Sequence, residues 1–254
     1  MKLIRTLAVY LYLAWIVVLG VPYFKHLEKR KEKLGGDQAV MQKIYAYARG
    51  MACRIVALTG SDIIVKGSEH LPKDQTVLYV ANHQSYMDIP VMMSVIEQPV
   101  GFVAKEEIGK IPFFSKWIVH MKCVLIARGD ARKALTAILQ AGKFLREGHS
   151  LVLYPEGTRS ADGYLGEFKA GSLKAAQKGK VAIVPIALQG ARDIMPRNSF
   201  WIYKAQATVT VLPMISAETV QSMDTKELAA LVKGQIAEAL GQSLPAESGD
   251  ELNG

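Results

Sequence analysis

The sequence has few of the residues that mark several classes of protein. Two cysteines among 254 residues exclude a disulfide-dense secreted scaffold. The 21 glycines and 10 prolines are close to average usage, which excludes collagen-like and low-complexity chains. The five histidines and two cysteines do not have zinc-site spacing, and there is no Gly-rich nucleotide-binding loop. We therefore expect neither a metal nor a bound cofactor.

Charge is absent from Thr6 to Phe24. This segment supplies almost all of the positive mean hydropathy of the chain, +0.14. As a helix it would be about 28 Å long, just short of a hydrocarbon core of about 30 Å. It can therefore span a bilayer or lie in the interface. The run is longer than a signal-peptide core, so cleavage after Gly20 ranks third, and a buried core helix is a further alternative.

The net charge of +8 is unevenly distributed. Residues 1–54 carry +7, residues 55–216 carry +6, and residues 217–254 carry −5. A basic cluster directly after the apolar run favours contact with anionic membrane lipids and a cytoplasmic location for the rest of the chain. Its members are Lys25, Lys29, Arg30, Lys31 and Lys33. Because no aromatic-interleaved basic motif accompanies the charge, we expect no nucleic-acid partner.

Hydrophobic periodicity divides the chain into three parts. Residues 1–60 form a membrane anchor whose second helix, 38–58, is amphipathic, and residues 217–254 form an acidic helix at 224–240 with a tail. Between them, 61–216 alternates short apolar runs with helical segments, which predicts a catalytic α/β domain with a largely parallel sheet flanked by helices. The predicted strands are 63–65, 77–80, 100–103, 124–126, 151–154, 182–184 and 208–211.

A chemical motif comes directly after the second predicted strand. The run is Asn82-His83-Gln84-Ser85-Tyr86-Met87-Asp88. Two residues five positions apart lie about 140° apart on a helix, so His83 and Asp88 can pair only if His83 precedes the helix that Asp88 begins. A carboxylate would then orient an imidazole that acts as a general base. The pattern is short and common, and alone it indicates little.

Four blocks in order resemble glycerolipid acyltransferases, particularly 1-acyl-sn-glycerol-3-phosphate acyltransferases. The first is the Asn-His-x4-Asp run above. The others are Lys105-Glu106-Glu107-Ile108-Gly109-Lys110-Ile111-Pro112-Phe113-Phe114, Tyr154-Pro155-Glu156-Gly157-Thr158-Arg159-Ser160 and Val184-Pro185-Ile186-Ala187-Leu188. Tyr154 replaces the usual phenylalanine, Ser115 a small glycine, and Ala127 an acid that usually precedes the arginine at 128.

The resemblance implies that an acyl chain passes from a thioester, acyl-CoA or acyl-carrier protein, to the sn-2 hydroxyl of lysophosphatidic acid, forming phosphatidic acid. His83 would be the general base and Asp88 its orienting partner. The implied substrate-binding residues are Asn82, Lys105, Arg128, Glu156, Gly157, Thr158 and Arg159. A thiol with a pKa near about 8.5 leaves readily, and Gly-x-Ser-x-Gly is absent, so direct transfer needs no acyl-enzyme.

The implied location is a membrane, such as a bacterial inner membrane, with the catalytic domain on the cytoplasmic side. Three alternatives stay open. The acceptor can be another lysolipid or an amino-lipid, the protein can be a membrane-attached lipid-binding protein without catalysis, or it can be a secreted hydrolase. Arg159 and Lys105 favour a phosphate-bearing acceptor, and the presence of both His83 and Asp88 favours catalysis.

Overall fold

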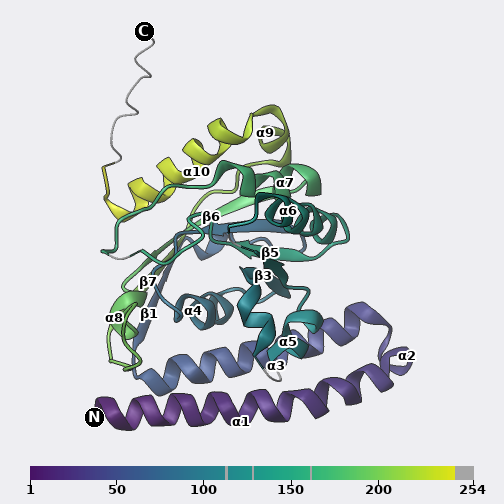
Figure 1. Ribbon diagram of the computed structural model, residues 1–254, viewed down its shortest axis with the longest axis vertical. Helices are drawn as coiled ribbons and strands as arrows, with labels where there is room; N and C mark the ends of the chain where they lie inside the picture. Colours follow the sequence, from purple (N-terminus) through teal and green to yellow (C-terminus); the bar gives the residue numbers. More distant parts are fainter. Residues whose placement is uncertain (112–113, 128, 161, 244–254) are drawn as a thin grey trace.

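The structure is a computed structural model that describes residues 1–111, 114–127, 129–160 and 162–243. A seven-stranded sheet lies at its centre with helices on both faces (Figure 1). All neighbouring strands are parallel except β6 and β7, which are antiparallel. The prediction of a largely parallel α/β fold is therefore confirmed. In spatial order the strands are β1 (Asp62–Lys66), β7 (Gln206–Val211), β6 (Ala182–Gln189), β2 (Val77–Ala81), β5 (Ser150–Leu153), β3 (Val100–Lys105) and β4 (Val124–Ile126).

Two helical layers cover the two faces of the sheet. Below it in Figure 1 lie α1 (Lys2–Lys29), α3 (Asp37–Thr59), α4 (Asp88–Val95), α5 (Phe114–His120) and α8 (Ala191–Ile194). Above it lie α6 (Ala131–Arg146), α7 (Lys174–Gly179), α9 (Ala217–Ser222) and α10 (Thr225–Leu240). The short elements are α2 (Lys31–Leu34) and the 3₁₀ turns η1 (Ser68–His70), η2 (Glu106–Lys110) and η3 (Ala170–Leu173).

The central strand β2 is buried on both faces. Val77, Tyr79 and Ala81 pack in the lower core, whereas Leu78 and Val80 pack in the upper core. Successive side chains of a strand point to opposite faces, so a strand between two helical layers must be apolar at every position. This explains why β2 is a continuous apolar run in the sequence. Because β2 is buried in the centre of the sheet, the loop that follows it begins at a fixed position at one edge.

The sheet order brings three chain segments to one edge. Strands β5, β2 and β6 are neighbours and run parallel, so their carboxyl ends lie together. The loop after β2 holds the first motif, the loop after β5 holds the third, and the fourth lies within β6. Ligands of open parallel sheets bind at this edge.

Helix α1 is longer than predicted. The apolar run predicted a helix over Thr6–Phe24, but α1 begins at Lys2 and continues through Pro22 to Lys29. Proline gives up one backbone hydrogen bond. Phe24 and Leu27 beyond it are buried, and their packing offsets that loss. The helix α3, Asp37–Thr59, agrees with the prediction of 38–58.

One side of α1 is docked on the protein and the other is exposed. The buried side carries Thr6, Val9, Ile16, Gly20, Phe24 and Leu27. The exposed side carries Leu3, Ile4, Leu7, Tyr10, Leu11, Trp15, Val18 and Leu19. Among the described residues, α1 is the one helix long and apolar enough to cross a membrane by length and composition. The apolar contacts of α1, α3 and the lower face of the sheet form one core.

Aromatic packing holds the carboxyl half of α1. The ring of Phe24 meets that of Trp117 at 4.7 Å and that of Tyr47 at 5.9 Å, both edge to face. At Gly20 the helix approaches Trp117 so closely that an added Cβ would lie 2.4 Å from the indole ring. These contacts require a small residue at 20 and a ring at 24.

We expect Phe24→Ala to lower the free energy of unfolding by about 3–5 kcal/mol, because a fully buried ring is removed and a cavity is left. The matched control is Trp15→Ala, which removes an exposed ring from the same helix. Denaturant unfolding in detergent measures both variants. Equal stability of the two would show that the docked side of α1 contributes no more than its exposed side.

Candidate active site

His83 and Asp88 lie within hydrogen-bonding distance. The Nδ1 atom of His83 is 2.6 Å from Oδ2 of Asp88. His83 belongs to the loop after β2, and Asp88 is the first residue of α4. This is the arrangement that the five-residue spacing requires. Because a carboxylate only accepts hydrogen bonds, Nδ1 carries the proton and Nε2 is left with a free lone pair.

The carboxylate of Asp88 organises the loop as well as the imidazole. Its side chain is fully buried, and Oδ2 also accepts hydrogen bonds from the backbone N–H groups of Gln84, at 2.7 Å, and Ser85, at 2.9 Å. A negative charge in the first turn of a helix is favoured by the helix dipole. Three donors converge on one oxygen and compensate part of the cost of burying the charge.

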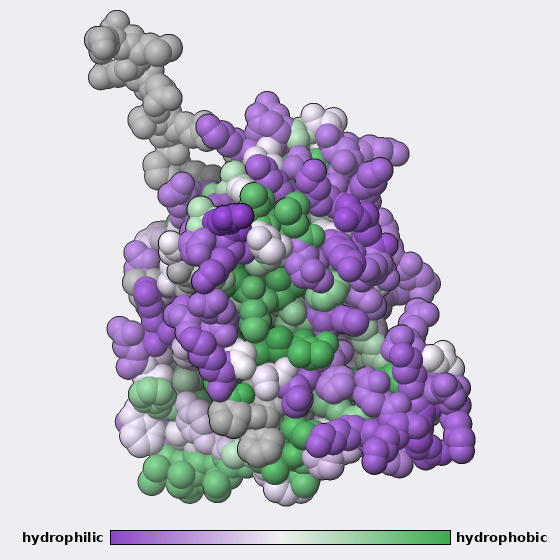
Figure 2. Space-filling view, turned by 45° about the vertical axis from the view of Figure 1, so that its right-hand side comes forward, coloured by the Kyte–Doolittle hydropathy of each residue, from purple (hydrophilic) through white to green (hydrophobic). Residues whose placement is uncertain are grey.

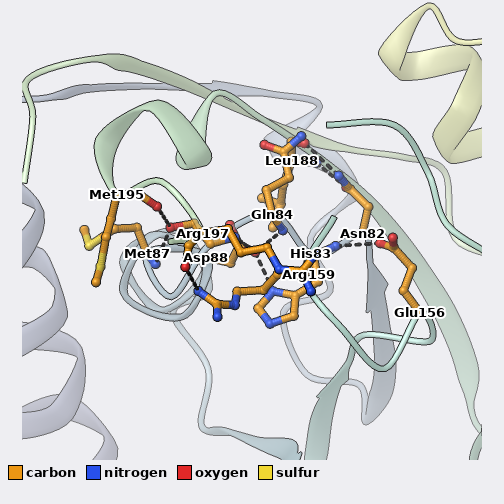
Figure 3. Close-up of polar contacts among 11 residues, drawn as sticks. Asn82, His83, Gln84, Met87, Asp88, Glu156, Arg159, Leu188, Met195 and Arg197 are labelled. Atoms are coloured by element: carbon orange, nitrogen blue, oxygen red, sulfur yellow. Dashed lines mark hydrogen bonds and ion pairs between the residues drawn. The ribbon is translucent and has the colours of Figure 1, made fainter. Parts of the chain in front are cut away.

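Glu156 of the third motif connects the two loops. Its Oε1 accepts a hydrogen bond from the backbone N–H of His83 at 2.8 Å (Figure 3). Its Oε2 accepts one from the backbone N–H of Gly166 at 2.9 Å. A Cβ at Gly166 would lie 2.9 Å from Oε2, so this approach needs glycine. Burial raises the pKa of the Glu156 carboxyl, and the two N–H donors oppose that rise.

The backbone of His83 is held on both sides by the third motif. Its N–H donates to Glu156, and its carbonyl accepts a hydrogen bond from the backbone N–H of Ser160 at 2.8 Å. The preceding residue, Asn82, is held through its side chain by the backbone of Leu188. Its amide nitrogen donates to the carbonyl of Leu188 at 2.9 Å, and its Oδ1 accepts from the N–H of Leu188 at 2.7 Å. The third and fourth motifs therefore hold two consecutive residues of the first, since Glu156 and Ser160 contact His83 and Leu188 contacts Asn82.

Tyr154 stacks on the imidazole of His83. The ring centroids are 4.4 Å apart and the planes are tilted by 22°. The hydroxyl group is buried, and within the described part of the chain it has no hydrogen-bond partner. Burial raises its pKa well above the usual value, and the Asp88 carboxylate adds to that rise. The aromatic ring at 154 thus has a packing role that phenylalanine would also serve.

Arg159 is held by two contacts. Its guanidinium lies over the ring of Tyr86, 3.9 Å from the centroid, and Nη1 donates to the carbonyl of Arg197 at 3.2 Å. Cation–π stacking and a fixed donor limit the positions available to the guanidinium fork. Tyr86 lies between His83 and Asp88 in the chain, so the arginine contacts the same loop that carries the imidazole. Figure 3 shows Arg159 next to His83.

The remaining implied residues differ in their surroundings. Gly157 has φ +67°, a left-handed conformation that favours glycine, and its neighbour Thr158 is exposed in the turn. Lys105 ends β3 and forms a 2.7 Å ion pair with Glu107, whose pKa it lowers. The ammonium of Lys169 lies beside Gly157, 3.2 Å from where a Cβ would be. Arg128 and residues 112 and 113 of the second motif lie outside the described residues.

Ser85 is not placed as a nucleophile. It is fully buried, its hydroxyl donates to the carbonyl of Met195 at 2.7 Å, and it accepts from the N–H of Met87. Sequence reasoning missed this contact and the one between Arg159 and Arg197. Both use backbone carbonyl groups of a distant loop, and a carbonyl has no signature in a sequence. Tyr86, by contrast, was recognisable as an aromatic residue inside the first motif.

Residues 62–189 match the family model described as Acyltransferase, which is half of the chain. The chain therefore belongs to the acyltransferase family. The matched range runs from β1 to the end of β6 and includes all four motifs.

Particular relatives carry more specific names. A 1-acyl-sn-glycerol-3-phosphate acyltransferase of Borreliella burgdorferi is 31% identical over 183 residues, which are 72% of this chain and 73% of that protein. A chloroplastic 1-acyl-sn-glycerol-3-phosphate acyltransferase of Arabidopsis thaliana is 39% identical over 138 residues, but these are only 38% of its length. The crystal structure of the 1-acyl-sn-glycerophosphate acyltransferase of Thermotoga maritima superposes with a TM-score of 0.76 at 27% identity, covering 96% of this chain and all of that one.

We expect Glu156→Gln to lower kcat by about 10- to 100-fold, with little change in the KM for the lipid acceptor. One carboxylate oxygen becomes an NH₂ group that faces an N–H donor, and we expect this loss of a hydrogen bond to displace His83. The matched control is Glu167→Gln, which changes an exposed glutamate of the same loop. Steady-state kinetics distinguish the two roles of Glu156. A rise in KM at constant kcat would mean that its carboxylate contacts the substrate instead.

Proposed function

We propose that this protein acylates the sn-2 hydroxyl of 1-acyl-sn-glycerol 3-phosphate and forms phosphatidic acid, using acyl-CoA or acyl-carrier protein as donor. The observation that carries the proposal is the His83–Asp88 pair on the same loop as Tyr86, which stacks on Arg159. It combines a base for a hydroxyl group with a guanidinium for a phosphate. The names of the relatives support the same acceptor.

In the proposed mechanism, Nε2 of His83 accepts the proton of the sn-2 hydroxyl as its oxygen bonds to the thioester carbonyl carbon. Asp88 stabilises the imidazolium that forms, as the carboxylate of a serine-hydrolase triad does. The tetrahedral intermediate then collapses, the C–S bond breaks, and the thiolate takes the proton from the imidazolium. No covalent acyl-enzyme is needed, and the buried hydroxyl of Ser85, bonded to a carbonyl, supports direct transfer.

We propose that α1 lies in the membrane interface and does not span the bilayer. Buried residues recur along it from Thr6 to Leu27, so one side contacts protein along nearly the whole length. A perpendicular helix would carry the docked domain into the hydrocarbon, where its polar groups would lose their water. Lying flat, α1 presents its exposed apolar side to acyl chains. The catalytic domain would face the cytoplasm, where the thioester donors occur.

For His83→Ala we expect turnover to fall by about 10²- to 10⁴-fold with the fold intact, because the general base is lost. Release of free thiol from acyl-CoA, with lysophosphatidate as acceptor, measures the rate. The matched control is His149→Ala, a half-buried histidine immediately before β5, at the amino end of the same sheet. Lysophosphatidate binding without thiol release by the wild-type protein would favour a non-catalytic lipid-binding function.

Arg159→Lys keeps the charge but loses the planar fork, so we expect the KM for lysophosphatidate to rise by about tenfold or more. The KM for a lyso-acceptor without a phosphomonoester should change little. The control is Arg146→Lys, whose guanidinium also donates to a backbone carbonyl but lies on α6. An unchanged KM for lysophosphatidate in Arg159→Lys would remove this residue from the phosphate site.

A further inference from the structure

The loop between α8 and β7, residues 195–205, joins the active site to the exposed side of α1. At its start, the carbonyl of Met195 accepts a hydrogen bond from the hydroxyl of Ser85, and the carbonyl of Arg197 accepts one from the guanidinium of Arg159. A few residues later the loop turns outward and exposes two large aromatic side chains. Phe200 is 79% exposed and Trp201 is 39% exposed. Burying such rings normally stabilises a protein, so their exposure needs an explanation.

The exposed aromatic residues are fixed to the amino-terminal turns of α1. The Tyr10 hydroxyl donates to the carbonyl of Phe200 at 3.2 Å, and the Thr6 hydroxyl accepts the N–H of Ile202 at 2.9 Å. The ammonium of Lys2 lies 5.0 Å from the centre of the Trp201 ring. Ile202, which follows Trp201, is buried and packs in the hydrophobic core of the lower layer.

The aromatic pair extends the apolar side of α1. The loop contacts α1 at positions 2, 6 and 10, one helical stripe. The next stripe, about 100° around the helix, is Leu3, Leu7 and Leu11, all exposed. Figure 2 shows hydrophobic residues at the lower left of the molecule and hydrophilic ones at the lower right, and Figure 1 places the amino-terminal end of α1 at the lower left. Phe200 and Trp201 therefore border a surface that is already apolar.

Charge around this surface suits anionic lipid headgroups. Residues 1–10 and 195–205 contain no acidic residue, and they contain four basic ones. These are Lys2, Arg5, Arg197 and Lys204. Tryptophan beside lysine and arginine is the composition that proteins place at the boundary between headgroups and acyl chains. A soluble partner protein would not need a basic rim that continues onto a helix as apolar as α1.

We infer that the 195–205 loop is a second membrane-contacting element, which inserts Phe200 and Trp201 into the headgroup region of an anionic bilayer. The inference rests on the proposed interfacial position of α1. Because the same loop holds Arg159 through the carbonyl of Arg197, its depth in the interface sets the height of the phosphate-binding guanidinium. A lysolipid phosphate in the membrane surface would then meet Arg159 without leaving the bilayer.

The test compares four forms of the full chain on vesicles of equal parts dioleoyl phosphatidylcholine and dioleoyl phosphatidylglycerol. They are the wild type, Phe200→Ser/Trp201→Ser in the loop, Leu7→Ser/Leu11→Ser on α1, and Tyr164→Ser as a matched control. Tyr164 is 68% exposed, and the next residue bonds to Gln242 near the end of α10, in the layer opposite α1. Co-sedimentation gives the partition coefficient of each.

We expect the loop variant to bind about tenfold less and the control to bind like the wild type. The loop variant should also have a raised KM for lysophosphatidate in vesicles and an unchanged kcat for detergent-dispersed lysophosphatidate. A fifth form, Trp201→Phe, keeps an aromatic ring and should bind like the wild type. If the double variant is unstable, Phe200→Ser alone provides the test, since Phe200 is the more exposed of the two side chains.

Two results would overturn the inference, and they are distinguishable. If the loop variant binds like the wild type while the α1 variant binds less, the loop does not contact the membrane but α1 does. If the wild-type protein itself stays in the supernatant, then the proposed interfacial position of α1 is wrong, and so is the inferred membrane contact of the loop. Neither result bears on thiol release in detergent, so the proposed reaction is tested separately.

Discussion

The active site depends on the burial of one carboxylate. Asp88 is fully buried, and three donors converge on a single oxygen of its side chain. A carboxylate in the interior is costly unless it is hydrogen-bonded, and the imidazole and its loop supply the bonds to Oδ2, whereas Oδ1 has no partner among the described residues. Any movement of the loop would leave the charge without partners. The hydrogen bonds to Asp88 that stabilise the loop conformation therefore also fix the position of His83.

The third motif adds a second constraint from a different strand. Glu156 and Ser160 hold the N–H and carbonyl groups of His83, so the loop after β5 fixes the loop after β2 through the backbone. These loops meet because β2 and β5 are parallel neighbours. The carboxylate of Glu156 spans two loops, so this position has a structural requirement whether or not Glu156 also contacts substrate, as was predicted. A glycine at 166 permits the close approach.

Sequence patterns predicted the parts whose physics is local. Continuous apolar runs marked the strands, and the five-residue spacing indicated that His83 and Asp88 pair across a loop–helix boundary. The contact of Arg159 with the Arg197 carbonyl could not be predicted from the sequence, since any residue can supply a backbone carbonyl. The carboxyl end of α1 was also missed, because proline normally ends a helix and the packing of Phe24 beyond it depends on tertiary structure.

The uncharged segment at the amino terminus shows why hydropathy alone does not separate spanning from interfacial helices. The mean hydropathy of this segment is high because both sides of α1 are apolar, yet only one of the two sides packs on protein. Phe24 and Leu27 pack on protein, while Leu7 and Leu11 face outward. A helix with protein along one side has only the other side available for lipid, and this is the basis for proposing that α1 lies along the surface of the bilayer. In that proposed orientation, the amino-terminal end of α1 and the loop carrying Trp201, which Lys2 contacts, would both reach the membrane that holds a lysolipid acceptor.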